Sequence, residues 1–233
     1  KIPEYQRDFE WEDDNIKKFQ TDIIKEYIKS TQYFFGPMVF VSRPEAQSNP
    51  DGSINVDVID GQQRLTTTFV LLEVILQITE ERNWDNDEKV IVKDKVNEIL
   101  IGNDKKYKLK TSKLNNEFYE DFIKTKKKEK KENIEKKKSR YNEYKKKKSN
   151  QKKANEKLWK AYLFLYEQVE KYTHEDKTGE NAGVTENNTL IPKKGELKNL
   201  ITSLSDAFEI VHIGTSSLAE GSDIFVNLNM VRK

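Results

Sequence analysis

Asp60-Gly61-Gln62-Gln63-Arg64 is the segment of this sequence whose residue types are best suited to chemistry on a phosphate. It stands where an alternating, strand-like run gives way to a helical pattern. The first N–H groups of a helix point outward at the positive end of its dipole, so such a junction attracts anions. Gly61 lets the backbone approach a phosphate closely, and Arg64 can donate two hydrogen bonds to its oxygens. Asp60 can hold Mg²⁺ or orient an attacking water, and Gln62 and Gln63 can orient water or read a base.

The same segment also fits a purely structural role. Asp60 would then cap the helix, and Arg64 would be a solvated surface residue. Three consecutive threonines follow at positions 66–68, and threonine is a poor helix former. This run favours a ligand-contact role for Thr66 and Thr67.

A second segment, residues 1–11, can bring further groups to the same place. Pro3 favours extended geometry for its neighbour. Tyr5, Gln6 and Arg7 follow it, and an arginine beside an aromatic ring can meet the same phosphate or stack on a base. The structural alternative is an edge strand whose aromatic residues belong to the core.

The elements that must position these residues follow from hydrophobic spacing. Strands are expected at 33–42 and 54–59, paired with each other, then at 107–114 and 208–213. Helices are expected at 14–30, from 62 to beyond 76 (with a buried stripe of Leu65, Phe69, Leu72, Ile75 and Leu76), at 158–172, 196–204 and 222–229, with a loop at 173–192. Residues 88–101 are expected to form a helix, or a helix followed by a strand. Strands and helices mix without a regular βαβ repeat, which favours an α+β fold.

Charge divides the chain into two parts. The 233 residues carry a formal net charge of only +2. Residues 124–153 contain 16 Lys or Arg and 4 Asp or Glu, a charge of +12, so the remaining residues carry −10. The apolar residues of this window are Ile134, Tyr141 and Tyr144. The chain is therefore a mildly acidic body with a Lys-rich, helical insert.

The insert can track a DNA backbone, because lysine clusters displace condensed counterions from phosphates. We single out Lys145, Lys146, Lys147 and Lys148 for this contact, and Tyr141 and Tyr144 can add base stacking. Two alternatives stay open. Charge runs are often solvated helix faces, and only 6 of the 42 basic residues are Arg, which is typical of an A/T-rich coding sequence.

Composition excludes several classes of protein. The absence of Cys excludes disulfide scaffolds, thiolate zinc sites and cysteine nucleophiles. His174 and His212 are the only histidines, and their surroundings favour structural roles over a His-metal nuclease. We find no run of about 20 apolar residues and no signal peptide, so we expect a cytoplasmic protein. Because the sequence starts at Lys1 without Met and stops at Lys233 without an obvious terminator, we also expect it to be a piece of a longer protein.

Four motifs together resemble the N-terminal domain of GmrSD-type, modification-dependent restriction proteins. They are Ile2-Pro3-Glu4-Tyr5-Gln6-Arg7, Phe35-Gly36, the run from Asp60 to Thr67, and Ile224-Phe225-Val226-Asn227-Leu228-Asn229. The family usually has Gly soon after that last Asn, whereas this chain has Met230-Val231-Arg232-Lys233. The resemblance covers the whole chain except the Lys-rich insert, and D-G-Q-Q-R is its most specific part.

The resemblance implies a ParB/sulfiredoxin-like domain, a small mixed sheet with packed helices. It implies that residues 1–115 form the core, 116–157 the insert, and 158–233 the completion of the same domain. It further implies binding and hydrolysis of a nucleoside triphosphate such as GTP, with Mg²⁺, at Asp60–Arg64. Tyr5, Gln6, Arg7 and Asn229 would be neighbours of that site.

In such systems hydrolysis regulates cleavage of modified phage DNA by a nuclease domain in the same or a partner chain. The residue that activates water is not given by the resemblance, and we expect Asp60 or Gln63. A non-catalytic module that binds nucleotide or DNA is the alternative.

Overall fold

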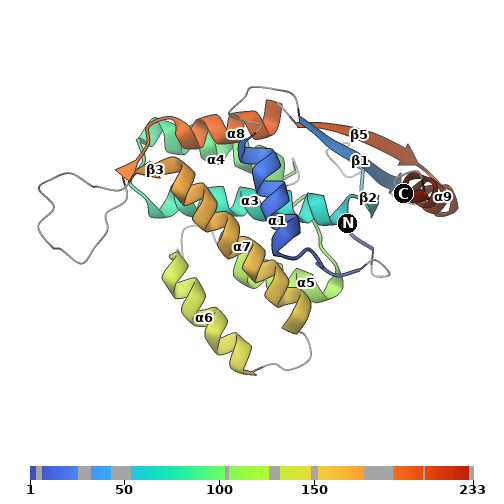
Figure 1. Ribbon diagram of the computed structural model, residues 1–233, viewed down its shortest axis with the longest axis horizontal. Coiled ribbons are helices and arrows are strands. Elements are labelled where there is room, and N and C mark those ends of the chain that lie inside the picture. Colours follow the sequence, from blue (N-terminus) through green and yellow to red (C-terminus); the bar gives the residue numbers. More distant parts are fainter. Residues whose placement is uncertain are drawn as a thin grey trace, which may run out of the picture.

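The computed structural model describes residues 1–3, 7–25, 33–42, 54–102, 105–125, 132–147, 152–175, 191–206 and 208–230. Figure 1 shows a body of packed helices from which a small sheet and one helix project at one end. The expected α+β class is confirmed by this mixture of helices with a three-stranded mixed sheet. The described elements are α1 (Asp13–Gln20), the π-helical turn η1 (Thr21–Lys25), β1 (Tyr33–Ser42), β2 (Val56–Asp60), α3 (Gln62–Glu81), α4 (Asn86–Leu100), α5 (Lys113–Phe118), the π-helical turn η2 (Tyr119–Ile123), α6 (Ile134–Lys147), α7 (Lys152–Thr173), β3 (His174–Glu175), β4 (Ile191–Pro192), α8 (Glu196–Asp206), β5 (Phe208–Thr215) and α9 (Leu218–Met230).

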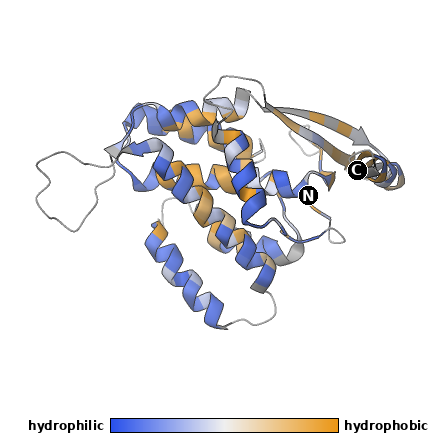
Figure 2. Cartoon of the chain, in the orientation of Figure 1, coloured by the Kyte–Doolittle hydropathy of each residue, from blue (hydrophilic) through white to orange (hydrophobic). Residues whose placement is uncertain are grey.

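Helix α3 is the centre of the helical body. It is buried around most of its circumference, unlike a surface helix with a single apolar stripe. Helices α4 and α7 pack directly against it. Figure 2 shows hydrophobic residues concentrated where these helices face one another. Because neighbouring helices hold α3 on several sides, the residues of its first turn have a fixed position.

The sheet has the strand order β2-β1-β5. β1 and β2 are antiparallel, which confirms their expected pairing, and β5 runs parallel to β1. Lys1 extends the outer edge of β2, since its N donates to Val56 O (2.7 Å) and its O accepts from Val58 N (2.9 Å). Helix α9 covers one face and closes a second small core with Val39, Val41 and Ile59.

Several expected boundaries differ from those observed. The strand expected at 107–114 is wrong: the segment makes one isolated bridge, Ile101 to Tyr107, and α5 begins at Lys113. Its alternation reflects burial of Leu109 and Thr111 without a strand partner. Helix α7 begins at Lys152, six residues before the expected start and inside the predicted insert.

The ends of two other expected segments also differ. Residues 176–190 of the loop expected at 173–192 lie outside the described ranges, and the residues on either side form β3 and β4, with His174 paired to Pro192. The helix expected at 14–30 changes to π-helical geometry at Thr21, and its last five residues lie outside the described ranges.

The Lys-rich insert is packed against the body through its few apolar residues. Ile134 and Tyr141 are each 7% exposed. Their spacing of seven, with Tyr144 three further on, places all three on one face of α6. Tyr141 stacks on Trp159 of α7 with ring centroids 4.8 Å apart, and Tyr144 lies against Phe122 at 5.1 Å. The expectation that these tyrosines stack on DNA bases is wrong for Tyr141, because α7 already covers its ring.

Candidate functional site

The junction between β2 and α3 contains the D-G-Q-Q-R segment. Asp60 ends the strand, and Gly61 turns the chain with φ of 87°, a left-handed conformation that favours glycine. Gly61 is the N-cap residue, so no side chain caps α3 from that position. The helix then runs for 20 residues, which concentrates the positive end of its dipole at the junction.

Arg64 holds the first strand to this helix start. Its Nη1 donates to Phe35 O (2.6 Å) and its Nη2 donates to Pro37 O (2.7 Å). Its side chain is 19% exposed, so the expectation of a solvated surface residue is wrong. Gly36 has φ of 97°, and a Cβ there would overlap Nη1 of Arg64. The F-F-G and D-G-Q-Q-R motifs are therefore two halves of one packing unit.

Asp60 lies beside Arg64 but does not cap the helix. Its Oδ2 lies 3.7 Å from Nη2 of Arg64, and its side chain is 16% exposed. Oδ2 accepts no hydrogen bond from any residue that the structure describes. A largely buried carboxylate oxygen at a helix start, with spare acceptor capacity, can hold a cation or orient a water.

Gln63 joins the N-terminal segment to the junction. Its Nε2 donates to Asp8 O (3.0 Å), and its Oε1 accepts from Glu10 N (2.9 Å). The structure thus brings the two motifs together across more than fifty residues. Both ends of the amide are engaged by backbone, so Gln63 positions residues 8–10.

The threonines of the first turns mainly serve the helix. Thr67 and Thr68 donate back to Gln63 O and Arg64 O, each at 2.9 Å, a pattern by which threonine satisfies its hydroxyl within a helix. Thr66 is 4% and Thr67 0% exposed. Gln62 is also buried, at 8% exposed.

The remaining predicted neighbours lie at the margin of the junction or outside the described residues. Arg7 is an exposed surface residue paired with Glu10 at 3.3 Å. Tyr5 and Gln6 lie outside the described residues. Asn229 is in the last turn of α9, which packs on the sheet, and its side chain is outside the described set.

Comparison with known protein families shows which family the chain belongs to. A model described as the GmrSD restriction endonuclease N-terminal domain matches residues 1–233. The chain belongs to this GmrSD N-terminal family. Membership implies a role in a restriction system that acts on modified DNA, with DNA and a nuclease domain as partners. A search of curated proteins found no match.

Two further observations on this GmrSD domain concern metal ligands and membrane-spanning helices. Within the described ranges, no group of three or more His, Asp or Glu side chains is placed to hold a metal ion by itself. The described helices also include none that is long and apolar enough to cross a membrane.

The basic insert of the GmrSD domain exposes part of its predicted DNA-contact cluster. Lys145 and Lys146 lie exposed near the end of α6, while the side chain of Lys147 and all of Lys148 lie outside the described part. Lys145 pairs with Glu156 of α7 at 3.4 Å, with 54% of its side chain exposed. The inward packing of the aromatic residues turns these lysines toward solvent.

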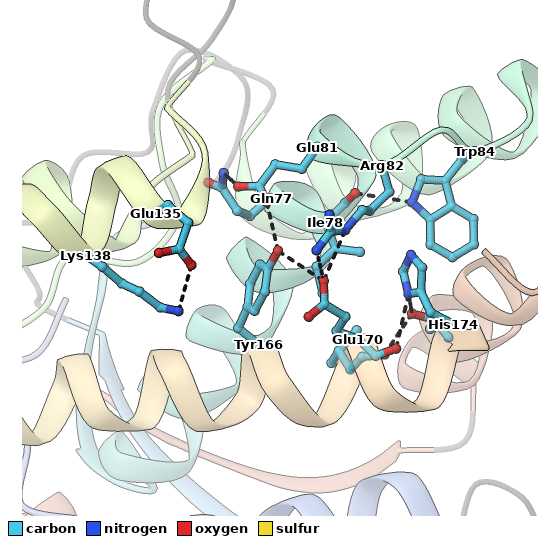
Figure 3. Close-up of polar contacts among 12 residues, drawn as sticks. Gln77, Ile78, Glu81, Arg82, Trp84, Glu135, Lys138, Tyr166, Glu170 and His174 are labelled. Atoms are coloured by element: carbon cyan, nitrogen blue, oxygen red, sulfur yellow. Dashed lines mark hydrogen bonds and ion pairs between the residues drawn. The ribbon is translucent and has the colours of Figure 1, made fainter. Parts of the chain in front are cut away.

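A polar network in the helical body was missed by sequence reasoning. In Figure 3, Tyr166 and Glu170 of α7 reach toward Glu81 and Arg82 at the end of α3. Tyr166 donates to Glu81 at 2.8 Å, and Arg82 forms an ion pair with Glu170. A cavity of about 350 Å³ opens between this end of α3 and the start of α6.

Glu73 and Lys137 are the charged groups buried most deeply near that cavity. Glu73 accepts from Thr125 N (2.7 Å) and from the hydroxyl of Tyr107, and burial raises the pKa of its carboxyl. Lys137 donates to Tyr162 Oη at 3.1 Å, and burial lowers the pKa of its ammonium group to about 8. The sequence signal was a lone glutamate within the apolar run 69–76.

Proposed function

We propose that the β2–α3 junction binds the phosphates of a nucleoside triphosphate such as GTP, and that this domain hydrolyses it to regulate cleavage of modified phage DNA. The environment of Asp60 is the main observation that supports this proposal. Asp60 is a largely buried carboxylate at the end of β2, directly before the N-cap residue of a long helix, and its Oδ2 lies 3.7 Å from Nη2 of Arg64 but accepts no hydrogen bond from the described residues. A helix start beside a cation is suited to phosphate.

Mg²⁺ fits the same arrangement. This ion is commonly held by one or two carboxylates together with substrate phosphates rather than by an all-protein cage. Asp60 supplies one such carboxylate, since its Oδ2 accepts no hydrogen bond from the described residues. When bound, Mg²⁺ supplies charge neutralisation on the phosphate oxygens.

The contacts divide the motif into distinct roles. Gly61 and the start of α3 contact the phosphates, with Gln62, Thr66 and Thr67 supporting that turn. Asp60 is a better candidate than Gln63 for orienting water, because both ends of the Gln63 amide are bound to backbone. Arg64 contributes positive charge while it holds β1 through two carbonyl groups.

The test is phosphate release from GTP, ATP, CTP and UTP. We expect Asp60→Asn to reduce turnover at least about a hundredfold, the lower limit typical of one catalytic proton-transfer group. Arg64→Lys is preferable to Arg64→Ala, because alanine would also free two carbonyl groups of β1. Asp85→Asn is the matched control, since Asp85 caps α4 at the far end of α3. Unchanged turnover in Asp60→Asn would contradict the proposal.

The non-catalytic alternative predicts a different pattern. A nucleotide-binding module would bind one of the four nucleotides with Asp60-dependent affinity but release no phosphate. Equilibrium binding measured beside turnover separates these two outcomes.

A second function, DNA contact by the insert, is supported by the packing of α6. Its apolar residues face α7, whereas Lys145 and Lys146 near its end face solvent. We infer that Lys145 to Lys148 contact the DNA backbone. Replacing all four by Glu should weaken retention of DNA in low salt, and unchanged retention would refute this contact.

A further inference from the structure

A second cavity, of about 490 Å³, lies between the start of α1 and the middle of α7. This volume is within the range of small-molecule sites in proteins. The two helices lie beside each other in the helical body (Figure 1). The lining combines two half-buried aromatic residues with charged residues of both signs: Trp11, Phe164, Lys17, Lys157, Lys160, Glu12, Asp13 and Asp14.

A row of lysines leads to this cavity along α7. Lys153, Lys157 and Lys160 are spaced by four and three residues, and Phe164 continues the spacing, so all four lie on one helix face. Lys153 and Lys160 are exposed. Lys157 is engaged internally, because it pairs with Glu12 at 3.0 Å and donates to Glu10 O at 3.3 Å.

Glu156 connects this row to the basic insert. Its Oε1 lies 3.4 Å from Nζ of Lys145 on α6 and 3.9 Å from Nζ of Lys160 on α7. The two ammonium groups therefore belong to one surface. Three exposed lysines, Lys145, Lys153 and Lys160, thus lie between the end of α6 and the rim of the aromatic cavity, with the Glu156 carboxylate between two of them.

We propose that this cavity receives an unstacked base of a DNA strand whose phosphates lie along Lys145, Lys153 and Lys160. A basic track beside aromatic rings is the arrangement by which proteins hold single-stranded nucleic acid, with phosphates on the cations and bases on the rings. The inference rests on the proposed DNA contact of the insert and adds to it a site for the base.

The carboxylates of the cavity indicate which edge of the base is recognised. Asp13 and Asp14 are exposed at the first turn of α1 and would repel a phosphate, but carboxylates accept hydrogen bonds from amino groups on base edges. Cytosine has such an amino group and thymine does not. The cavity thus favours an amino-bearing base such as cytosine over thymine.

The test uses fluorescence anisotropy with the whole chain and three labelled 12-nucleotide probes: oligo-dC, oligo-dT and a probe with abasic sites at its central positions. We expect oligo-dC to bind at least about fivefold more tightly than the abasic probe, the lower limit for one stacked base. Phe164→Ala should remove this difference while keeping affinity for the abasic probe. Trp11→Leu should do the same and serves if Phe164→Ala folds poorly.

Phe34→Ala is the control for loss of a phenyl ring, because Phe34 is exposed, at 57%, lies on β1 and does not line the cavity. Equal affinity of the parent chain for oligo-dC and the abasic probe would overturn the cavity proposal and leave the lysine track intact. Loss of binding to both probes in Lys160→Glu supports the track. No binding of any probe by the parent chain would overturn both proposals.

A competition experiment with GTP distinguishes a DNA base from the base of a nucleotide as the occupant of the cavity. If GTP displaced oligo-dC and Phe164→Ala abolished GTP binding, the cavity would hold the base of the nucleotide instead of a DNA base. That result would overturn the present assignment.

Discussion

At the scale of single residues, the D-G-Q-Q-R motif joins structure to the proposed chemistry. Arg64 and Gln63 bind backbone atoms of β1 and of the N-terminal segment, respectively, while Asp60 keeps an oxygen with no hydrogen-bond donor among the described residues. A single motif can thus fix three segments and still present one carboxylate at the helix start.

Gly36 tests whether Arg64 acts as this structural link. Gly36→Ala should lower the free energy of unfolding by about 3 kcal/mol, through its positive φ and the displacement of a guanidinium that donates two hydrogen bonds. Gly195→Ala is the control, because Gly195 also has positive φ (83°) but its Cβ would lie 4.0 Å from the nearest atom, Asn199 Nδ2. It should cost only about 1–2 kcal/mol. Equal losses of unfolding free energy in Gly36→Ala and Gly195→Ala, measured by urea denaturation, would contradict this structural role of Arg64.

His174 provides a prediction for pH. Its Nδ1 donates to Glu170 O at 3.1 Å, and its ring meets Trp84 edge-on. Burial lowers the pKa of the imidazole below its usual 6.5, so the unfolded chain binds more protons below about pH 6.5 and stability should fall there. His174→Gln should flatten unfolding free energy against pH between 7 and 5. A parallel decline in both proteins would contradict this.

At the scale of elements, α6 is docked by two aromatic residues and a buried lysine. Tyr141 and Tyr144 contact a cluster of Phe118, Phe122 and Trp159, and Lys137 donates to Tyr162 Oη. Tyr141→Ala should cost about 3 kcal/mol for a buried aromatic and expose α6 to trypsin well before the rest of the chain. Asn142→Ala, an exposed change on the same helix that removes no trypsin site, should leave the cleavage pattern unchanged. Uniform cleavage of the body and α6 in Tyr141→Ala would contradict local docking.

Periodicity was sufficient to predict the long, regular elements and the pairing of β1 with β2. It could not predict that residues 107–114 alternate without forming a strand, because burial produces the same alternation with or without a partner. The motif location was also visible in the sequence, but the partners of Arg64 were not. Those carbonyl groups belong to β1, nearly thirty residues away, and only tertiary packing brings them to the guanidinium.

At the scale of the whole molecule, the basic insert and the acidic body that the sequence distinguishes also occupy different parts of the structure. Figure 1 places α6 on the opposite side of the helical body from α8. The shared carboxylate of Glu156 shows that the basic surface extends from the insert onto α7. Lys145 of the insert and Lys160 of α7 therefore belong to one surface, although the boundary expected at residue 157 lies between them.

This surface predicts the salt dependence of DNA binding. If Lys145, Lys146 and Lys160 each neutralise one phosphate, replacing all three by Glu should reduce the slope of log affinity against log salt by about 3, since each contact contributes about 0.9 on duplex DNA. Lys171, Lys194 and Lys198 are exposed on the far end of α7 and around α8, and their replacement by Glu changes net charge equally. That control should alter affinity modestly and leave the slope nearly unchanged, because charges beyond a Debye length are screened. Identical slopes for the two triple variants would show that net charge, rather than this surface, governs DNA binding.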